Sequence, residues 1–164
     1  MMSSDRFHTF SAGLTMLLLL ALGLGWYSDA EALMVPLSID TIAASSSHIV
    51  RGEVVSAESQ WDSSHSYIYT NIKLRVRDRY KGACTDTINI VVPGGVVGET
   101  GLFVEHAAEL KLGEDVVVFL SQAGVVFDVT AYEQGKYTIA SGRVTEKNML
   151  LNEFIELVKA AALR

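Results

Sequence analysis

The sequence predicts a mainly β protein whose antiparallel sheet has one buried face and one face in water. Residues 48–95 contain three strand-like segments separated by turns. The second segment alternates with a period of two, with Ile68, Ile72, Leu74 and Val76 on one face and Lys73, Arg75, Arg77 and Arg79 on the other. Sustained alternation is typical of a half-buried antiparallel strand. A closed barrel and an open sandwich both show it, so the pattern leaves these two architectures open.

The first 32 residues have the pattern of a secretory signal peptide. Arg6 precedes an apolar run from Ala12 to Leu24, and small residues at Ala30 and Ala32 precede the expected cut. This run is shorter than the roughly 20 residues that a membrane span needs. We therefore expect an exported chain, periplasmic or extracellular, with no stable membrane span after cleavage. Retention of the segment as an N-terminal anchor is the alternative.

A short helix is expected over residues 38–45. Ser38 is a good N-cap, and Ile39, Ile42 and Ala43 have the i, i+3, i+4 spacing of one apolar stripe. Three serines, residues 45–47, end the pattern. We expect this helix to pack across the sheet.

The strands follow in order along the chain. We expect strands at 48–59, 67–80 and 87–92, the last one ended by Pro93, Gly94 and Gly95. Residues 96–115 lack clean periodicity and form a longer connection than usual, which is typical of functional loops. Residues 116–120 are continuously apolar, as in a strand buried on both faces. A fifth strand at 125–131 and a short one at 137–139 complete the set.

The period changes to that of a helix in the last segment, residues 146–164. Leu151, Phe154, Ile155, Val158 and Ala162 share one helix face. We expect this amphipathic helix to pack on the β domain and cover a sheet edge. Binding of a partner protein through the helix is the alternative.

Composition limits the classes of partner and the means of stabilisation. The 164 residues carry a formal net charge of −6, whereas nucleic-acid-binding domains are usually basic, so we expect no nucleic-acid partner. Cys84 is the only cysteine, so an internal disulfide is excluded and the core must supply the stability. We interpret Cys84 as a tolerated loop thiol, with a reactive or intermolecular role as the alternative.

No arrangement typical of catalysis or metal binding is present in the sequence. It has no His-Glu-x-x-His, Cys-x-x-Cys or Gly-x-Ser-x-Gly motif. Asp62 and His65 come closest to a metal pair, but a polar exposed loop explains them more simply. The basic row on the second strand is either a solvated face partly neutralised by Glu53 and Glu58 or a surface for a polyanion. We expect no catalytic residue, no metal and no cofactor.

The order of these landmarks resembles a known family. A short helix is followed by Ser-Ser-His-Ile-Val-Arg-Gly-Glu-Val-Val, a polar hairpin loop, a long strand ending Tyr-Lys-Gly, and a strand closing in Pro-Gly-Gly. This order resembles the N-terminal domain of the tissue inhibitors of metalloproteinases and the related netrin-like modules, and it is similar to a group of exported bacterial proteins. The resemblance implies a five-stranded antiparallel OB-like barrel over residues 33–145, with flanking helices.

The resemblance also implies a non-enzymatic, secreted protein-binding module that regulates or inhibits an exported metalloprotease. The family's inhibitors place an N-terminal cysteine on the protease zinc, whereas cleavage here leaves Leu33, so no inhibitory residue carries over. The expected partner-binding residues are Leu33, Met34, Val35, Trp61, Gly94, Gly95 and Phe103. A structural component of the cell envelope is the alternative function. A hydrolase using the dispersed residues Asp62, His65 and His106 is a third.

Overall fold

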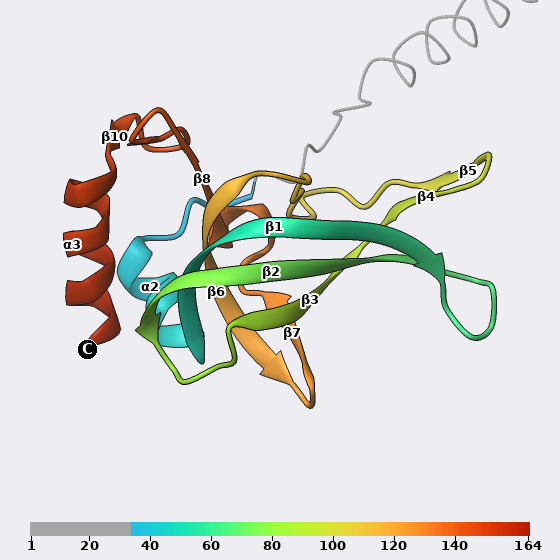
Figure 1. The fold of residues 1–164 in the computed structure, drawn as a ribbon, viewed down its shortest axis with the longest axis horizontal. Helices are drawn as coiled ribbons and strands as arrows, with labels where there is room; N and C mark the ends of the chain where they lie inside the picture. The colour runs from blue at the N-terminus through green and yellow to red at the C-terminus, as the bar shows by residue number, and fades with distance from the viewer. Residues whose placement is uncertain (1–33) are drawn as a thin grey trace, which may run out of the picture. The chain divides into compact units, whose positions relative to one another are not determined.

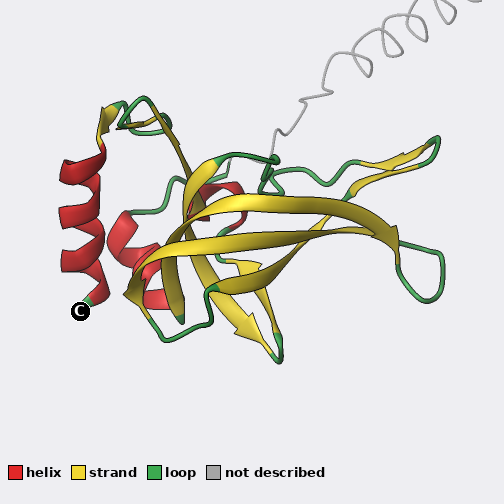
Figure 2. Cartoon of the chain, in the orientation of Figure 1, coloured by secondary structure: helices red, strands yellow, loops and turns green. Residues whose placement is uncertain are grey.

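The computed structural model describes residues 34–164, so the predicted signal peptide (1–32) and Leu33 lie outside the described residues. The first half of the fold contains α2 (Ile39–Ser45), β1 (His48–Trp61), β2 (Ile68–Lys81), β3 (Thr87–Pro93), β4 (Gly95–Val97) and β5 (Thr100–Leu102). The second half contains β6 (Asp115–Ala123), β7 (Val126–Val129), the 3-10 helix η1 (Tyr132–Gly135), β8 (Lys136–Ala140), β9 (Arg143–Val144), β10 (Met149–Leu150) and α3 (Leu151–Ala162). The protein is therefore mainly β, as predicted (Figures 1 and 2).

The main sheet is mixed and has eight strands in the order β1-β2-β3-β7-β6-β8-β9-β10. β6 also pairs with β1, so the pairings lead from β1 through β2, β3, β7 and β6 back to β1. The expectation of an entirely antiparallel sheet is wrong at one place, because β3 and β7 pair in parallel at Ile90 and Phe127. A single bridge of this kind leaves no periodic signal in the sequence. β4 and β5 form a separate two-stranded sheet.

The long β1–β2 ribbon has the alternation that the sequence predicted. Ile68, Ile72, Leu74 and Val76 are all buried on the inner face of β2. Its basic residues lie on the opposite, outer face, and the ribbon extends well beyond the helices in Figure 1. Three register shifts along β1 interrupt its pairing with β2, and such bulges increase the local twist of a strand.

β6 separates two hydrophobic clusters, which explains its continuous apolar run. Val116, Val118 and Leu120 belong to the cluster enclosed by β1, β2, β3 and β7. Val117 and Phe119 belong to the other cluster, which contains residues of both helices. A strand buried on both faces shows this division of alternate side chains, so the prediction for residues 116–120 is confirmed.

The two α-helices cover this second cluster. The predicted N-cap of α2 is confirmed, since the Ser38 side chain accepts a hydrogen bond from the Thr41 N–H at 3.1 Å. On α3, Phe154, Val158 and Ala161 are buried against the sheet. The helix begins at Leu151 rather than 146, because β9 and β10 form a small hairpin before it.

Residues 96–115 were expected to lack regular structure, and this expectation is wrong for the β4–β5 hairpin. Strands of three residues are too short for a period of two to be recognised. Among residues 34–164, no helix combines the length and apolar character that crossing a bilayer requires.

Candidate functional site

Gly94 and Gly95 carry the chain from β3 into the β4–β5 hairpin across the inner face of the β1–β2 ribbon. Their φ angles are +89° and +137°, a backbone conformation that residues with a side chain rarely adopt. A Cβ at position 95 would overlap the hydroxyl oxygens of Ser59 and Thr70. Thr70 Oγ1 donates to the Gly94 carbonyl at 2.7 Å, and the Val96 N–H donates to Ser59 Oγ at 3.3 Å. These glycines therefore hold the start of β4 close to the ribbon, and the hairpin projects from there (Figure 1).

A cavity of about 930 Å³ lies beside this hairpin, and we call it the hairpin groove. Gly95, Val96, Gly101, Leu102 and Phe103 form one part of its lining, which we call the hairpin wall, and the segment 106–111 forms another part, the second wall. The Phe103 side chain is 87% exposed and Val96 is 66% exposed. Exposed apolar side chains gathered beside a concavity mark an interaction surface more often than isolated ones do.

The charged residues of the hairpin groove make it acidic. Four glutamates and two lysines line it, namely Glu109, Glu114, Glu133, Glu146, Lys111 and Lys136. Lys136 and Glu114 form a largely buried ion pair at 3.1 Å. His106 Nδ1 lies 2.9 Å from Glu133, and the Glu133 N–H donates to the His106 carbonyl, which fixes the segment against η1. The groove thus joins an apolar wall to a charged end.

The beginning of the compact unit Pro36–Arg164 lies at that charged end. Pro36 and Leu37 line a smaller cavity of about 220 Å³ that shares Glu133, Lys136 and Glu146 with the hairpin groove. The Leu37 N–H donates to Gln134 Oε1 at 2.7 Å. The predicted site residues Met34 and Val35 directly precede this anchored segment, whereas Leu33 lies outside the described residues.

Trp61 lies at the far end of β1, where the ribbon turns. Its ring stacks on His65, with centroids 6.2 Å apart and planes inclined by 21°. Asp62 accepts hydrogen bonds from the Ser66 and Tyr67 N–H groups. The hydrogen bond from Ser64, followed by those backbone bonds, lowers the pKa of Asp62 to about 2. Asp62 therefore stabilises the turn, in agreement with the interpretation of a polar loop.

The residues of the hydrolase hypothesis do not gather at one place. His106 contacts Glu133 and Glu105, whereas Asp62 and His65 belong to the ribbon turn. His48 is buried, and its ring nitrogens lie within hydrogen-bond distance of Ser47 Oγ and the Ala83 carbonyl. No group of three histidine, cysteine or acidic residues within 34–164 could hold a metal ion.

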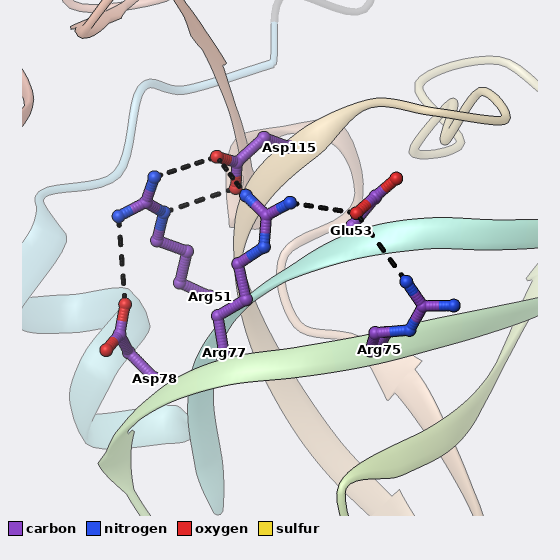
Figure 3. Close-up of polar contacts among 6 residues, drawn as sticks. All are labelled: Arg51, Glu53, Arg75, Arg77, Asp78 and Asp115. Atoms are coloured by element: carbon purple, nitrogen blue, oxygen red, sulfur yellow. Dashed lines mark hydrogen bonds and ion pairs between the residues drawn. The ribbon is translucent and has the colours of Figure 1, made fainter.

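Two residues of the basic row of β2, Arg75 and Arg77, belong to an outer polar cluster that also contains Arg51, Glu53, Asp78 and Asp115 (Figure 3). Arg79 pairs instead with Asp86 at 2.7 Å. Asp115 accepts from Arg51 at 2.8 Å and from Arg77 at 3.0 Å. The side-chain hydrogen bond from Arg51 to Asp115 is the main cause of the raised pKa of Arg51. Three acids balance three arginines, so the cluster offers little excess charge to a polyanion.

Glu53 is one of the two acids expected to neutralise the row, and it contacts Arg77 at 2.8 Å. Glu58, the other, accepts instead from Ser56 Oγ at 3.0 Å. Cys84 is half-buried against the first hydrophobic cluster, and its carbonyl accepts from Arg79 at 3.1 Å. The outer polar cluster therefore joins β1, β2 and β6 rather than forming a free cationic surface.

The structure brings Gly94, Gly95 and Phe103 together at the hairpin groove and places Trp61 at the tip of the ribbon. We did not predict the second wall of the groove from the sequence. The short alternation Ala-Glu-Leu-Lys-Leu at 108–112 could have indicated this wall, but it lies inside a segment that we expected to be irregular. In comparisons with known proteins, no family model matches this chain, and no curated protein matches it.

Proposed function

We propose that this chain is an exported, non-enzymatic protein-binding module whose hairpin groove receives part of a partner protein. The observation that carries this proposal is the groove of about 930 Å³ bordered by the exposed Phe103 side chain. Interfaces combine exposed aromatic anchors with a polar rim. The groove supplies both, because an acidic end adjoins its apolar wall. An exported metalloprotease is the candidate partner that the family resemblance suggests.

We also propose that the five mutually paired strands form an OB-like barrel. The pairing order β1-β2-β3-β7-β6, with β6 returning to β1, supports this arrangement. A ring of pairings leaves no open edge among its members, which is how small barrels avoid edge-to-edge association. Under this proposal, the hairpin groove lies beside the connection between the barrel strands β3 and β6.

A structural role in the cell envelope is the second candidate function, and the outer face of α3 favours it. Leu157 is 48% exposed and Leu163 is 90% exposed, although Phe154 and Val158 on the inner face are buried. Replacing both exposed leucines by serine should leave folding intact. Loss of envelope association in this variant would favour the structural role over capture of a protease.

The proposed function is tested by titrating the full chain against purified secreted zinc metalloproteases. We expect Phe103→Ala to weaken binding by about ten- to a hundredfold, as removal of an aromatic anchor does. Val125→Ala is the matched control, because Val125 is 92% exposed in the turn between β6 and β7. Equal binding by wild type and Phe103→Ala would refute the proposed surface, and loss of binding by Trp61→Ala alone would move it to the ribbon tip. Absence of binding to every protease would remove the metalloprotease as partner.

A further inference from the structure

We propose that the hairpin groove binds an extended peptide segment of its partner by strand addition along residues 107–111, and that the segment alternates apolar and basic side chains. This inference rests on the proposed function and names the chemistry that the same surface recognises. It requires an extended wall, backbone groups without partners, and side chains that complement the segment.

The wall from 107 to 111 has the side-chain directions of a β-strand. Ala108 and Leu110 are 4% and 5% exposed and belong to the first hydrophobic cluster. Glu109 and Lys111 are exposed and form an ion pair at 3.3 Å. In an extended chain, residues i and i+2 lie on the same side and alternate residues on the other. The two buried residues and the ion-paired residues follow this rule.

This wall has no partner strand in residues 34–164. No hydrogen bond joins the backbone N–H or C=O groups of Ala108, Glu109 or Leu110 to any other described residue. At the ends of this stretch, the Ala107 N–H donates to the Val104 carbonyl at 3.2 Å and the Lys111 N–H donates to Glu114 Oε2 at 3.0 Å. The Lys111 carbonyl also accepts from the Glu114 N–H at 3.1 Å. Unpaired extended backbone is a template for another strand.

The hairpin wall also has an open edge. β5 pairs with β4 from Thr100 to Leu102, and no described strand pairs with its other side. A stretch of five residues spans about 16 Å, so a hexapeptide covers the wall from 107 to 111.

The side chains of the groove select the composition of the segment. Leu102, Phe103 and Val104 offer apolar contacts to alternate side chains. Glu109 and Glu133 are exposed, although Glu109 pairs with Lys111 and Glu133 contacts His106. The groove carries four glutamates against two lysines, so acidic groups remain in excess. Opposite charges across an interface attract and orient a partner, and like charges suppress the wrong one. Basic residues are therefore expected between the apolar ones.

The probe is a fluorescein-labelled hexapeptide that alternates arginine and valine and is capped at both ends. It is titrated against the full chain by fluorescence anisotropy, and amide hydrogen exchange is followed with and without peptide. We expect binding with slowed exchange at 107–111. N-methylation of alternate peptide nitrogens should weaken binding about tenfold or more, since each lost backbone hydrogen bond lowers affinity several-fold. A peptide alternating glutamate and valine should bind at least about tenfold more weakly.

The inference is overturned if the arginine–valine peptide does not bind, if N-methylation has no effect, or if exchange slows only elsewhere. Phe103→Ala should weaken peptide binding, whereas Val125→Ala should not. Failure of the peptide while Phe103→Ala still weakens protease binding would remove strand addition and leave the proposed function. Peptide binding at 107–111, together with protease binding that is insensitive to Phe103→Ala, would remove the proposed function and leave strand addition.

Discussion

Replacement of Gly95 by alanine should destabilise the fold and displace the β4–β5 hairpin. A side chain held at φ +137° costs on the order of 1–3 kcal/mol. Overlap of the new methyl group with Ser59 and Thr70 adds about 1–3 kcal/mol, as overpacking in a tight site does. We therefore expect the free energy of unfolding to fall by about 2–6 kcal/mol, measured by urea denaturation of the full chain with circular dichroism.

Gly98→Ala is the matched control for this variant. Gly98 also has positive φ, at +61°, but a Cβ there meets no atom within 4 Å, so only about 1–2 kcal/mol of backbone strain is expected. Ser59→Ala in the Gly95→Ala background should recover part of the loss, because it removes one overlapping hydroxyl group. If the Gly95 and Gly98 variants lose the same stability, the close approach of the hairpin to the ribbon is refuted.

Three further variants test the core, the helix and the outer polar cluster. Burial, with a smaller effect of Glu146, raises the pKa of Tyr137 to about 12. The stability that the neutral phenol contributes is therefore complete below about pH 10 and is lost as the pH rises to 12, so Tyr137→Phe should reduce the alkaline loss of stability in pH-dependent denaturation. Phe154→Ala should lower the free energy of unfolding by about 3–5 kcal/mol, whereas Leu157→Ala should change it by less than about 0.5 kcal/mol in the same urea assay. Asp115→Asn should cost about 1–3 kcal/mol in denaturation experiments, because Arg51 loses its charged hydrogen-bond partner.

Strand periodicity made most of the β-sheet predictable from the sequence. The alternation from Ile68 to Val76 identified the buried face of β2, and the run from Val116 to Leu120 identified a strand between two clusters. Both patterns arise because alternate side chains of a strand lie on opposite faces, and a face that is buried carries apolar side chains. The parallel bridge at Ile90 and Phe127 left no such signal, because it joins one residue pair that is distant in sequence.

The site was predictable only in part. Phe103 is exposed as a binding residue should be, whereas Gly94 is buried and positions the hairpin. The second wall escaped detection because its alternation is short and it has no partner strand in the described residues. His106 and Glu133 meet across 27 positions of sequence, and no local pattern indicates such a contact.

The central claim is that the hairpin groove is the surface that holds the partner protein. A photo-crosslinking amino acid in place of Phe103 tests it most directly, in the full chain mixed with a secreted zinc metalloprotease that binds wild type. The same replacement at Val125 is the control, because that side chain is equally open but lies in another turn. We predict a covalent adduct with the protease from position 103 and none from position 125. Adducts from position 125 alone, or equally from both positions, would contradict the claim.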